Sequence, residues 1–284
     1  MTGAPASLPR RSRAASTAGP SSARKPLTRT GRYVRGAVGL LVIVAADEAL
    51  GRAGIVNEDS FPPASTVLKR AGALFGDSEF INVHLRSTLS AWGLGLLIAT
   101  LIAVPLGVLL GSVPIVNTAT RSLVEFLRPI PSVALIPLVG LILGLGLQMK
   151  VTLIVYAAVW PVLFNTVYGL RDVDPVAKET MRTFGFGPLA VLWRVGLPAS
   201  APFIYTGVRM ASSIALILTI GTEILSGFGE GVGIFIAQAN NDPSGTGDVL
   251  AGTVWAGCLG LIANAVLVRG ERRLFRWHLR EERA

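Results

Sequence analysis

The sequence predicts an all-α protein that crosses a membrane several times. Charged residues make up 15% of its 284 residues, whereas soluble domains carry about 25%. A helix needs roughly 20 mostly apolar residues to cross the hydrocarbon core. Stretches of 34, 21, 20 and 20 residues contain no Asp, Glu, Lys or Arg; they lie between Arg86 and Arg121, Arg128 and Lys150, Lys150 and Arg171, and Asp248 and Arg269. Four such stretches in one chain exclude a soluble globular domain.

We expect about six transmembrane spans, of which the first and the fifth are less apolar than the others. The first holds Asp47 and Glu48 near its outer end, and the fifth holds Arg209 and Glu223 with 13 uncharged residues between them. Charged side chains near the ends of a span can reach towards the interfaces. Glu223 is therefore expected at an interface in a structural role, with a proton or cation site as the alternative. The expected spans are 33–50, 88–110, 132–148, 151–170, 203–225 and 249–268.

The positive charges predict the orientation. With the N-terminus inside, 21 of the 26 Lys and Arg residues fall in inner segments and five in outer ones, and such residues favour the cytoplasmic side. We therefore expect a multi-pass protein of the cell membrane with both termini in the cytoplasm. Residues 1–32 are predicted to form a disordered basic arm that contacts anionic lipid and not nucleic acid. Residues 33–270 form the expected transmembrane domain, with a long cytoplasmic loop at 171–200, and 271–284 a cytoplasmic tail.

The sequence contains no constellation for catalysis or metal binding. Cys258 is the only cysteine, and the two histidines, His84 and His278, lie on opposite sides of the membrane in the expected topology. No GxxxxGK[ST] motif is present, so the chain does not bind ATP through a P-loop. We therefore predict that the chain is not an enzyme and that it has no catalytic residue, no metal site and no cofactor of its own.

Prolines and glycines interrupt the apolar segments. Pro129, Pro131 and Pro137 stand at the entry to the expected span 132–148, and irregular backbone at membrane depth is tolerated only against protein or a water-filled path. These prolines and Glu223 are the candidates for a translocation path or gate. Two GxxxG pairs permit close helix approach; they are Gly107 with Gly111 and Gly140 with Gly144.

The long cytoplasmic loop carries the strongest local signals. Asp174 can cap a helix over 175–184 that begins with proline. Gly185 supplies a left-handed residue at the end of that helix. A second short helix is expected over 189–194, ended by the Leu-Pro pair at 197–198. Two short amphipathic helices at an angle are typical of a docking element.

This loop resembles the EAA loop of binding-protein-dependent ABC importer permeases. That motif reads Glu-Ala-Ala, three residues, Gly, nine residues, Ile-x-Leu-Pro. Here Thr180 and Met181 replace the alanines and Val195 replaces the isoleucine, while the other motif positions match at the right spacing. The resemblance implies that the loop docks two helices into a groove of a cytoplasmic ATPase. The residues it implies in ATPase coupling are Glu179, Thr180, Met181, Arg182, Gly185, Val195, Leu197 and Pro198.

The similarity extends over about residues 36–278 and is to the nitrate/sulfonate/taurine branch of these permeases. It implies a type I ABC importer permease-like bundle that works as a homodimer. The implied partners are ATPase subunits, which hold ATP and Mg, and an extracytoplasmic solute-binding protein that delivers a small anion such as a sulfonate or nitrate. Two alternatives stay open: an ion-coupled secondary transporter or channel that uses Glu223, Asp47 or Glu48, and a membrane enzyme or assembly scaffold. The segments that carry the similarity are 127–138, 165–175, 222–225 and 271–277.

Overall fold

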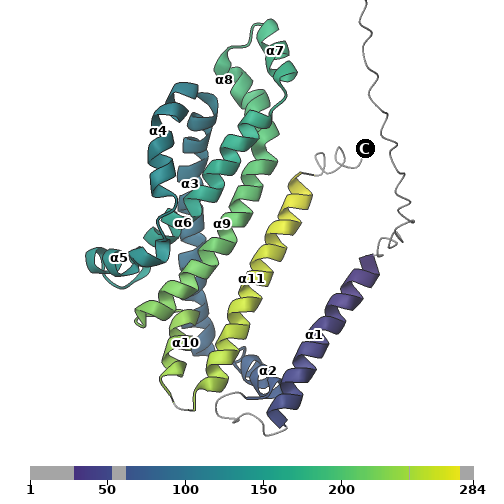
Figure 1. The fold of residues 1–284 in the computed structure, drawn as a ribbon, viewed down its shortest axis with the longest axis vertical. Coiled ribbons are helices and arrows are strands. Elements are labelled where there is room, and N and C mark those ends of the chain that lie inside the picture. The colour runs from purple at the N-terminus through teal and green to yellow at the C-terminus, as the bar shows by residue number, and fades with distance from the viewer. Residues whose placement is uncertain (1–28, 53–61, 243, 276–284) are drawn as a thin grey trace, which may run out of the picture. The chain divides into compact units, whose positions relative to one another are not determined.

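A computed structural model of the chain describes residues 29–52, 62–242 and 244–275 (Figure 1). Every regular element in these ranges is a helix or a helical turn, which confirms the predicted all-α class. The elements are α1 (Arg29–Arg52), α2 (Ala64–Ala73), a π-helical segment η1 (Phe80–Leu85), α3 (Arg86–Ser112), α4 (Pro114–Leu127), a 3₁₀ turn η2 (Ser132–Leu135), α5 (Ile136–Leu143), α6 (Leu147–Asp172), α7 (Pro175–Thr183), α8 (Pro188–Val191), a π-helical turn η3 (Leu192–Gly196), α9 (Leu197–Ser226), α10 (Val232–Asn240) and α11 (Thr246–Leu274).

Four helices in the described part of the chain are long and apolar enough to cross a membrane. They are Phe80–Ser112, Leu147–Asp172, Pro188–Ser226 and Thr246–Leu274. They contain the predicted spans 88–110, 151–170, 203–225 and 249–268. The pair formed by Pro114–Leu127 and Ser132–Leu143, which is bent by 75°, gives a fifth if it is one broken span.

The prediction of a continuous span over 132–148 is wrong. The helical segment ends at Leu143, and Gly144 follows with a φ of +75°. Twelve residues extend about 18 Å, which is less than the roughly 30 Å of the hydrocarbon core. Because the segment 132–148 contains no charged residue, its sequence predicts one span. The prolines interrupt the helix at its start, and Gly144 ends it after Leu143.

Helix α1 covers the predicted span 33–50 but is not among the helices that meet the length and apolarity of a span. Every stretch of 18 residues within it contains at least three charged residues. The number of six spans therefore stays a prediction. Because α1 begins at Arg29, the last four residues of the predicted disordered arm, 29–32, are helical. The chain divides within α1, between Ala46 and Asp47, into two units, and all further contacts described below lie within 47–284.

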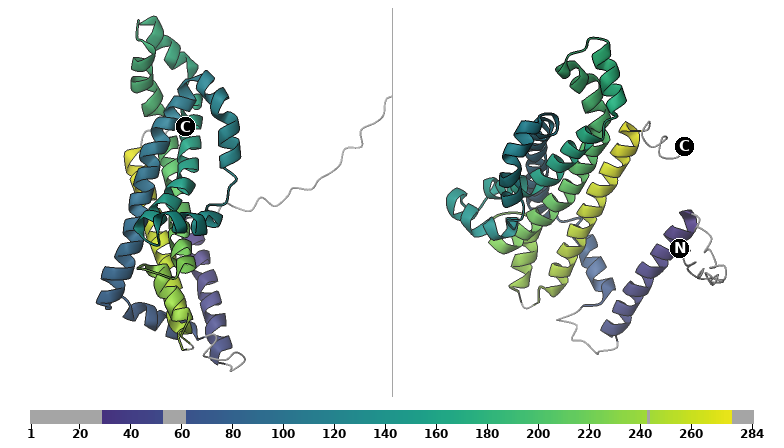
Figure 2. Two further views of the ribbon diagram at one scale, coloured as in Figure 1. Left: turned by 90° about the vertical axis from the view of Figure 1, so that its left-hand side faces the viewer. Right: turned by 45° about the horizontal axis from the view of Figure 1, so that its top comes forward.

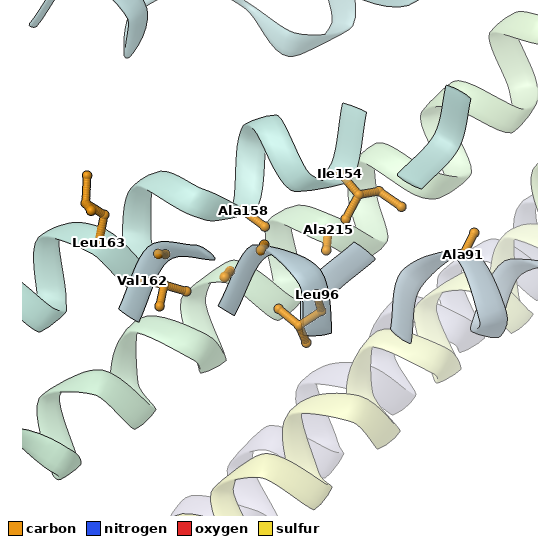
Figure 3. Packing of buried hydrophobic residues seen from close by; sticks show 10 residues of the cluster. Ala91, Leu96, Ile154, Ala158, Val162, Leu163 and Ala215 are labelled. Atoms are coloured by element: carbon orange, nitrogen blue, oxygen red, sulfur yellow. The ribbon is translucent and has the colours of Figure 1, made fainter. Parts of the chain in front are cut away.

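The core of the bundle is formed by α3, α6 and α9, which lie side by side (Figures 1 and 2). Small side chains dominate this core. Figure 3 shows Ala91, Ala158 and Ala215 among larger residues such as Ile154 and Val162. The hydrophobic effect does not drive helices together in lipid, because lipid tails are as apolar as the side chains. Small residues stabilise helix association there because they let the helix backbones approach closely.

The first GxxxG pair packs closely against α6. A Cβ on Gly107 would lie 2.6 Å from the Thr166 side chain, and one on Gly111 would lie 3.0 Å from Leu170. The second pair has a different role. Gly140 faces Leu145 and Met149, whereas Gly144 has open space around it and ends α5.

We expect Gly107→Ala to destabilise the bundle by about 1–3 kcal/mol, the usual cost of an added carbon in a full core. Gly93→Ala is the matched control, because Gly93 lies in the same helix with nothing within 4 Å of its added Cβ. Alanine favours the helix over glycine by about 1 kcal/mol, so the control is expected to be neutral or stabilising. Thermal unfolding in detergent measures both. Equal melting temperatures for the two variants would contradict the close contact.

Candidate functional site

The start and end of α7 are built as the sequence predicts. The Asp174 carboxylate accepts a hydrogen bond from the Val176 N–H at 2.8 Å, and Pro175 is the first helical residue. At the other end Gly185 has a φ of +84°. The Gly185 N–H donates to the Arg182 carbonyl at 2.9 Å and the Phe186 N–H to the Met181 carbonyl at 3.1 Å. This pair of bonds is the Schellman pattern of a glycine-terminated helix.

The second half of the loop differs from the prediction. The short helix begins at Pro188 and is not ended by Leu197 and Pro198, because the chain continues through η3 into α9 as one helical path, Pro188–Ser226. Proline cannot donate the bond that continues a regular helix. The wider π-helical turn directly before Pro198 accommodates this missing bond without ending the helix. The loop is therefore joined rigidly to a long helix of the bundle.

The EAA-motif residues lie on both halves of this element. Glu179, Thr180 and Arg182 are exposed on α7, with Met181 half-buried. The Glu179 carboxylate forms no ion pair with any described side chain. The remaining motif residues lie after the turn: Gly185 and Pro198 are exposed, and Val195 and Leu197 are half-buried. Lys178 anchors α7 to the bundle, because its Nζ donates to the Leu170 carbonyl at the end of α6 at 3.0 Å.

Large apolar side chains are exposed around these residues. α7 and α8 project from one end of the bundle (Figure 2). On them and on η3, Val176, Phe184, Leu189 and Trp193 are 66% to 76% exposed. We call these four residues the loop tip. From the sequence, Phe184 is predicted on the apolar stripe of the helix 175–184, whereas the other three residues are not singled out; Trp193, an aromatic residue outside the predicted spans, was the available signal. Exposed apolar and aromatic groups on a projecting element are typical of a surface that contacts another protein.

Glu223 is enclosed by protein. Its side chain is fully buried, and its Oε1 lies 2.8 Å from the Nζ of Lys150, which is itself buried. The Thr88 hydroxyl and the Gly233 N–H also donate to the carboxylate, at 2.9 Å each. Three donors from the protein satisfy the carboxylate inside the bundle, so the side chain does not reach out to lipid as predicted, whereas the ion pair agrees with the predicted structural role.

Lys150 also lies elsewhere than predicted. It is not in a link between two spans but in the first turn of α6. Besides Glu223, its Nζ donates to the Glu230 carbonyl at 2.6 Å. A Cβ on Gly231 would collide with the Glu223 carboxylate, so only glycine lets this loop approach so closely. The pair thus joins α3, α6, α9 and the segment before α10.

Protein groups occupy the carboxylates of both Glu223 and Glu48. The donors around Glu223 are all protein groups, and Glu48 accepts hydrogen bonds from Ser65 and Arg52. His84 is buried, with its Nδ1 3.0 Å from the Gly231 carbonyl. Within 29–52, 62–242 and 244–275 no group of three His, Cys, Asp or Glu side chains could hold a metal ion; His278 lies outside these ranges.

The proline-rich segment lies part of the way along α6. Pro129 and Pro131 form the link between α4 and η2, and Pro137 is in the first turn of α5. The link is held against α6, because the Tyr156 hydroxyl donates to the Leu127 carbonyl at 2.7 Å. Tyr156 lies 16 residues before the end of α6 at Asp172, which is about 24 Å along the helix. The irregular backbone therefore lies beside the middle of α6, with Pro129, Pro131 and Pro137 themselves exposed, and their role in a translocation path or gate stays a prediction.

Comparison with known proteins assigns the chain to a family. Residues 103–276 match the family described as "Binding-protein-dependent transport system inner membrane component". The taurine transport system permease protein of Escherichia coli (strain K12) is 29% identical over 76% of this chain and 80% of its own length. The aliphatic sulfonates transport permease protein of Bacillus subtilis (strain 168) is 28% identical over 89% and 91%. A nitrate import permease protein of Leptolyngbya laminosa is 27% identical over 68% of each chain.

A solved structure has the same fold. A chain of a methionine ABC transporter, solved in inward-facing conformations, superposes with a TM-score of 0.59 over 69% of this chain and 98% of its own, at 19% identity. This likeness concerns the fold alone. Together with the family match, it means that the chain belongs to the binding-protein-dependent transport system inner membrane component family, as a multi-pass, non-catalytic permease of the cell membrane.

Proposed function

We propose that this chain is the transmembrane subunit of an ATP-driven importer and that the loop 171–200 receives the motion of a cytoplasmic ATPase. The observation that carries the proposal is the loop itself, in which an exposed, capped helix pair presents four apolar side chains at one end of the bundle. The unpaired Glu179 stands beside them. A partner that buries this tip gains apolar contact area and a charge to pair with.

The loop is continuous with a helix of the bundle and can therefore transmit motion to it. Because Pro188–Ser226 is one helical path, a displacement of the tip is carried along α9 to Glu223, whose ion pair joins α9 to α3 and α6. A partner that binds one arrangement of the bundle better than another shifts the population between them. ATP and Mg belong to the partner in this proposal, and this chain binds no cofactor. The ion-coupled alternative is not favoured, since Glu223 is enclosed by protein donors.

The proposed solute is a small anion delivered by an extracytoplasmic binding protein, with the permease working as a homodimer. The solute is supported by the similarity to taurine, nitrate, aliphatic sulfonate and bicarbonate transport proteins. A carnitine transport permease protein of Listeria monocytogenes is 30% identical over 63% of this chain, so the fold also serves a different solute. Screening the cognate binding protein tests the solute. Binding of taurine, an alkyl sulfonate or nitrate is expected, and exclusive binding of a sugar or peptide would contradict it.

The partnership is tested by purifying the full chain from its own cells and identifying whether an ABC ATPase co-purifies. We expect a stable complex that contains two copies of each protein, measured by mass photometry or native mass spectrometry. As a control, the variant Leu189→Asp/Trp193→Asp places charges on the loop tip and is expected to lose the ATPase while keeping the permease folded. A permease that never retains an ATPase would contradict the proposal.

The orientation is tested with reporters. A reporter that is active only in the cytoplasm is expected to work after Arg32, within 171–200 or after Trp277, and to fail within 228–248, which contains no Lys or Arg. A reporter that is active only outside serves as the control and should give the complementary pattern. An inverted pattern, or termini on opposite sides, would contradict the charge-based orientation.

A further inference from the structure

A groove of about 820 Å³ lies between α4 and the second half of α6, next to the end of α3. Its lining combines arginines with aromatic rings. The residues that matter for its chemistry are Arg121, Arg128, Arg171, Phe164 and Tyr168. The groove is on the half of the bundle that carries α7 and α8, because α6 runs towards Asp172 and the loop that follows it.

Arg128 enters this groove from within the depth of the bundle. It directly follows α4, where the Leu127 carbonyl is held by Tyr156 about 24 Å from the end of α6. Its guanidinium lies over the Phe164 ring, 4.8 Å from the ring centre. Phe164 is eight residues from Asp172, so the charge is about 12 Å from the end of that helix. Arginines within transmembrane bundles are rare, usually face the bundle interior or a water-filled cavity, and mark ligand pathways; the Arg128 side chain is exposed to this groove.

The arginines of the groove are unequal. Arg121 is neutralised by Glu125, with 2.8 Å between Nε and Oε1. Neither Arg128 nor Arg171 is within ion-pair distance of any carboxylate in the described ranges. The two guanidinium groups without an ion-pair partner line the same groove. Their N–H donors are therefore available to bind an anion.

The other polar side chains of the groove are already engaged, with one exception. Asn117 donates to the Leu110 carbonyl, Thr118 to the Pro114 carbonyl and Thr120 to the Val116 carbonyl. The Tyr168 hydroxyl has no such bond, and its ring stacks on Phe164 with centres 6.3 Å apart. The polar groups of the groove that make no hydrogen bond among the described residues are therefore two guanidinium groups and one phenol. This set fits a compact oxyanion, which arginine binds with two parallel hydrogen bonds.

We propose that this groove binds the transported oxyanion, a sulfonate or nitrate, in the inner half of its path, with Arg128 as the residue that selects for negative charge. The proposal rests on the proposed function of anion import. The phosphate of an anionic lipid has the same chemistry as such a ligand, so the test must separate the two sources.

The test measures direct binding to the full-length permease in phosphatidylcholine nanodiscs, without binding protein, by calorimetry with methanesulfonate and with nitrate. We expect Arg128→Gln to weaken binding by about ten- to a hundred-fold, the range for losing charge-assisted hydrogen bonds, and Arg128→Lys to restore part of it. The matched control is Arg121→Gln/Glu125→Gln, which removes a neutral pair from the same groove and is expected to change binding less than three-fold. Similar thermal stability of the variants excludes misfolding as the cause.

Two outcomes would overturn the proposal. One is equal binding of methanesulfonate by the wild type and by Arg128→Gln. The other is retention of phosphatidylglycerol by the wild type and its loss from Arg128→Gln in native mass spectrometry, with solute binding unchanged; the groove would then hold a lipid. Uptake by the permease–ATPase complex is measured separately. Absence of anion uptake by the wild-type complex would contradict the proposed function, whereas wild-type uptake and binding in Arg128→Gln would contradict only this assignment.

Discussion

Gly185→Val is expected to reduce ATP-coupled uptake at least ten-fold while the transmembrane bundle stays folded. Gly185 has a φ of +84°, and nothing lies within 4 Å of the position that a Cβ would take. Valine at this position would therefore clash with no neighbouring atom. Its backbone would be strained, because a left-handed φ costs a β-branched residue roughly 1–2 kcal/mol. The chain relieves this strain by opening the two bonds that end α7, which reorients α7 relative to α8. A displaced loop tip no longer fits the surface of its partner.

Gly187→Val is the matched control for this variant. Gly187 is two residues away, also has nothing within 4 Å, but has a φ of −70° and a ψ of 166°, which valine adopts readily. Both variants are purified with the ATPase, and ATPase retention, binding-protein-stimulated hydrolysis and uptake are measured in proteoliposomes. Equal uptake by the two variants would show that the geometry at Gly185 does not matter for coupling.

Glu179→Arg extends the same test to charge. Glu179 is exposed and has no described ion-pair partner, so its reversal costs the isolated permease little but turns an attraction to the partner into repulsion. Glu79→Arg, an exposed reversal just before η1, is the control and is expected to keep ATPase retention at the wild-type level. If Glu179→Arg also retains the ATPase and stimulated hydrolysis in full, Glu179 is only a solvent-exposed residue of α7 and does not contact the ATPase.

Glu223→Met is expected to be strongly destabilising. It leaves the buried Lys150 ammonium without its carboxylate, and removing one partner of a buried pair costs about 3–5 kcal/mol. Lys150→Met is expected to have an effect of similar size. Because the double variant Lys150→Met/Glu223→Met leaves no unpaired charge, it should be destabilised by clearly less than the sum of the single variants. Thermal unfolding in detergent measures all three.

The control for this cycle is the exposed pair of Arg121 and Glu125, one helical turn apart. Exposed ion pairs of this kind contribute little to the free energy of unfolding, so Arg121→Ala should leave the melting temperature nearly unchanged. Additive effects of Lys150 and Glu223 substitutions, or melting temperatures as high as that of Arg121→Ala, would mean that the buried pair does not hold α3, α6 and α9 together.

Two kinds of feature could be predicted from the sequence because their causes are local. Long uncharged stretches became α3, α6 and α11, and the less apolar fifth span became α9, since the cost of charge in lipid acts on each segment by itself. The loop followed from the Asp174 cap, Pro175 and Gly185, each of which acts within one helical turn. The same reasoning failed for 132–148, because hydropathy counts apolar residues and does not register that the chain turns at Pro131 and Gly144.

Features that depend on pairing across the fold could not be predicted. Lys150 and Glu223 are 73 residues apart, and each alone resembles a charge near the end of a span. Only the packing of α6 against α9 shows that they neutralise each other. The groove beside Arg128 has the same origin, because its wall is formed where α4 turns back along α6. Pro198 shows the opposite error: a strong local signal for a helix end was overridden by a π-helical turn inside a long helix.

The most direct measurement of the central claim is solute uptake by the permease and its ATPase in proteoliposomes, with binding protein and labelled taurine or nitrate outside and ATP inside. Accumulation is expected only when ATP, the ATPase and the binding protein are all present, without any imposed ion gradient, and Gly185→Val should abolish it. Uptake by the permease alone, driven by a proton or sodium gradient and lost in Glu223→Gln, would contradict the account and identify an ion-coupled transporter.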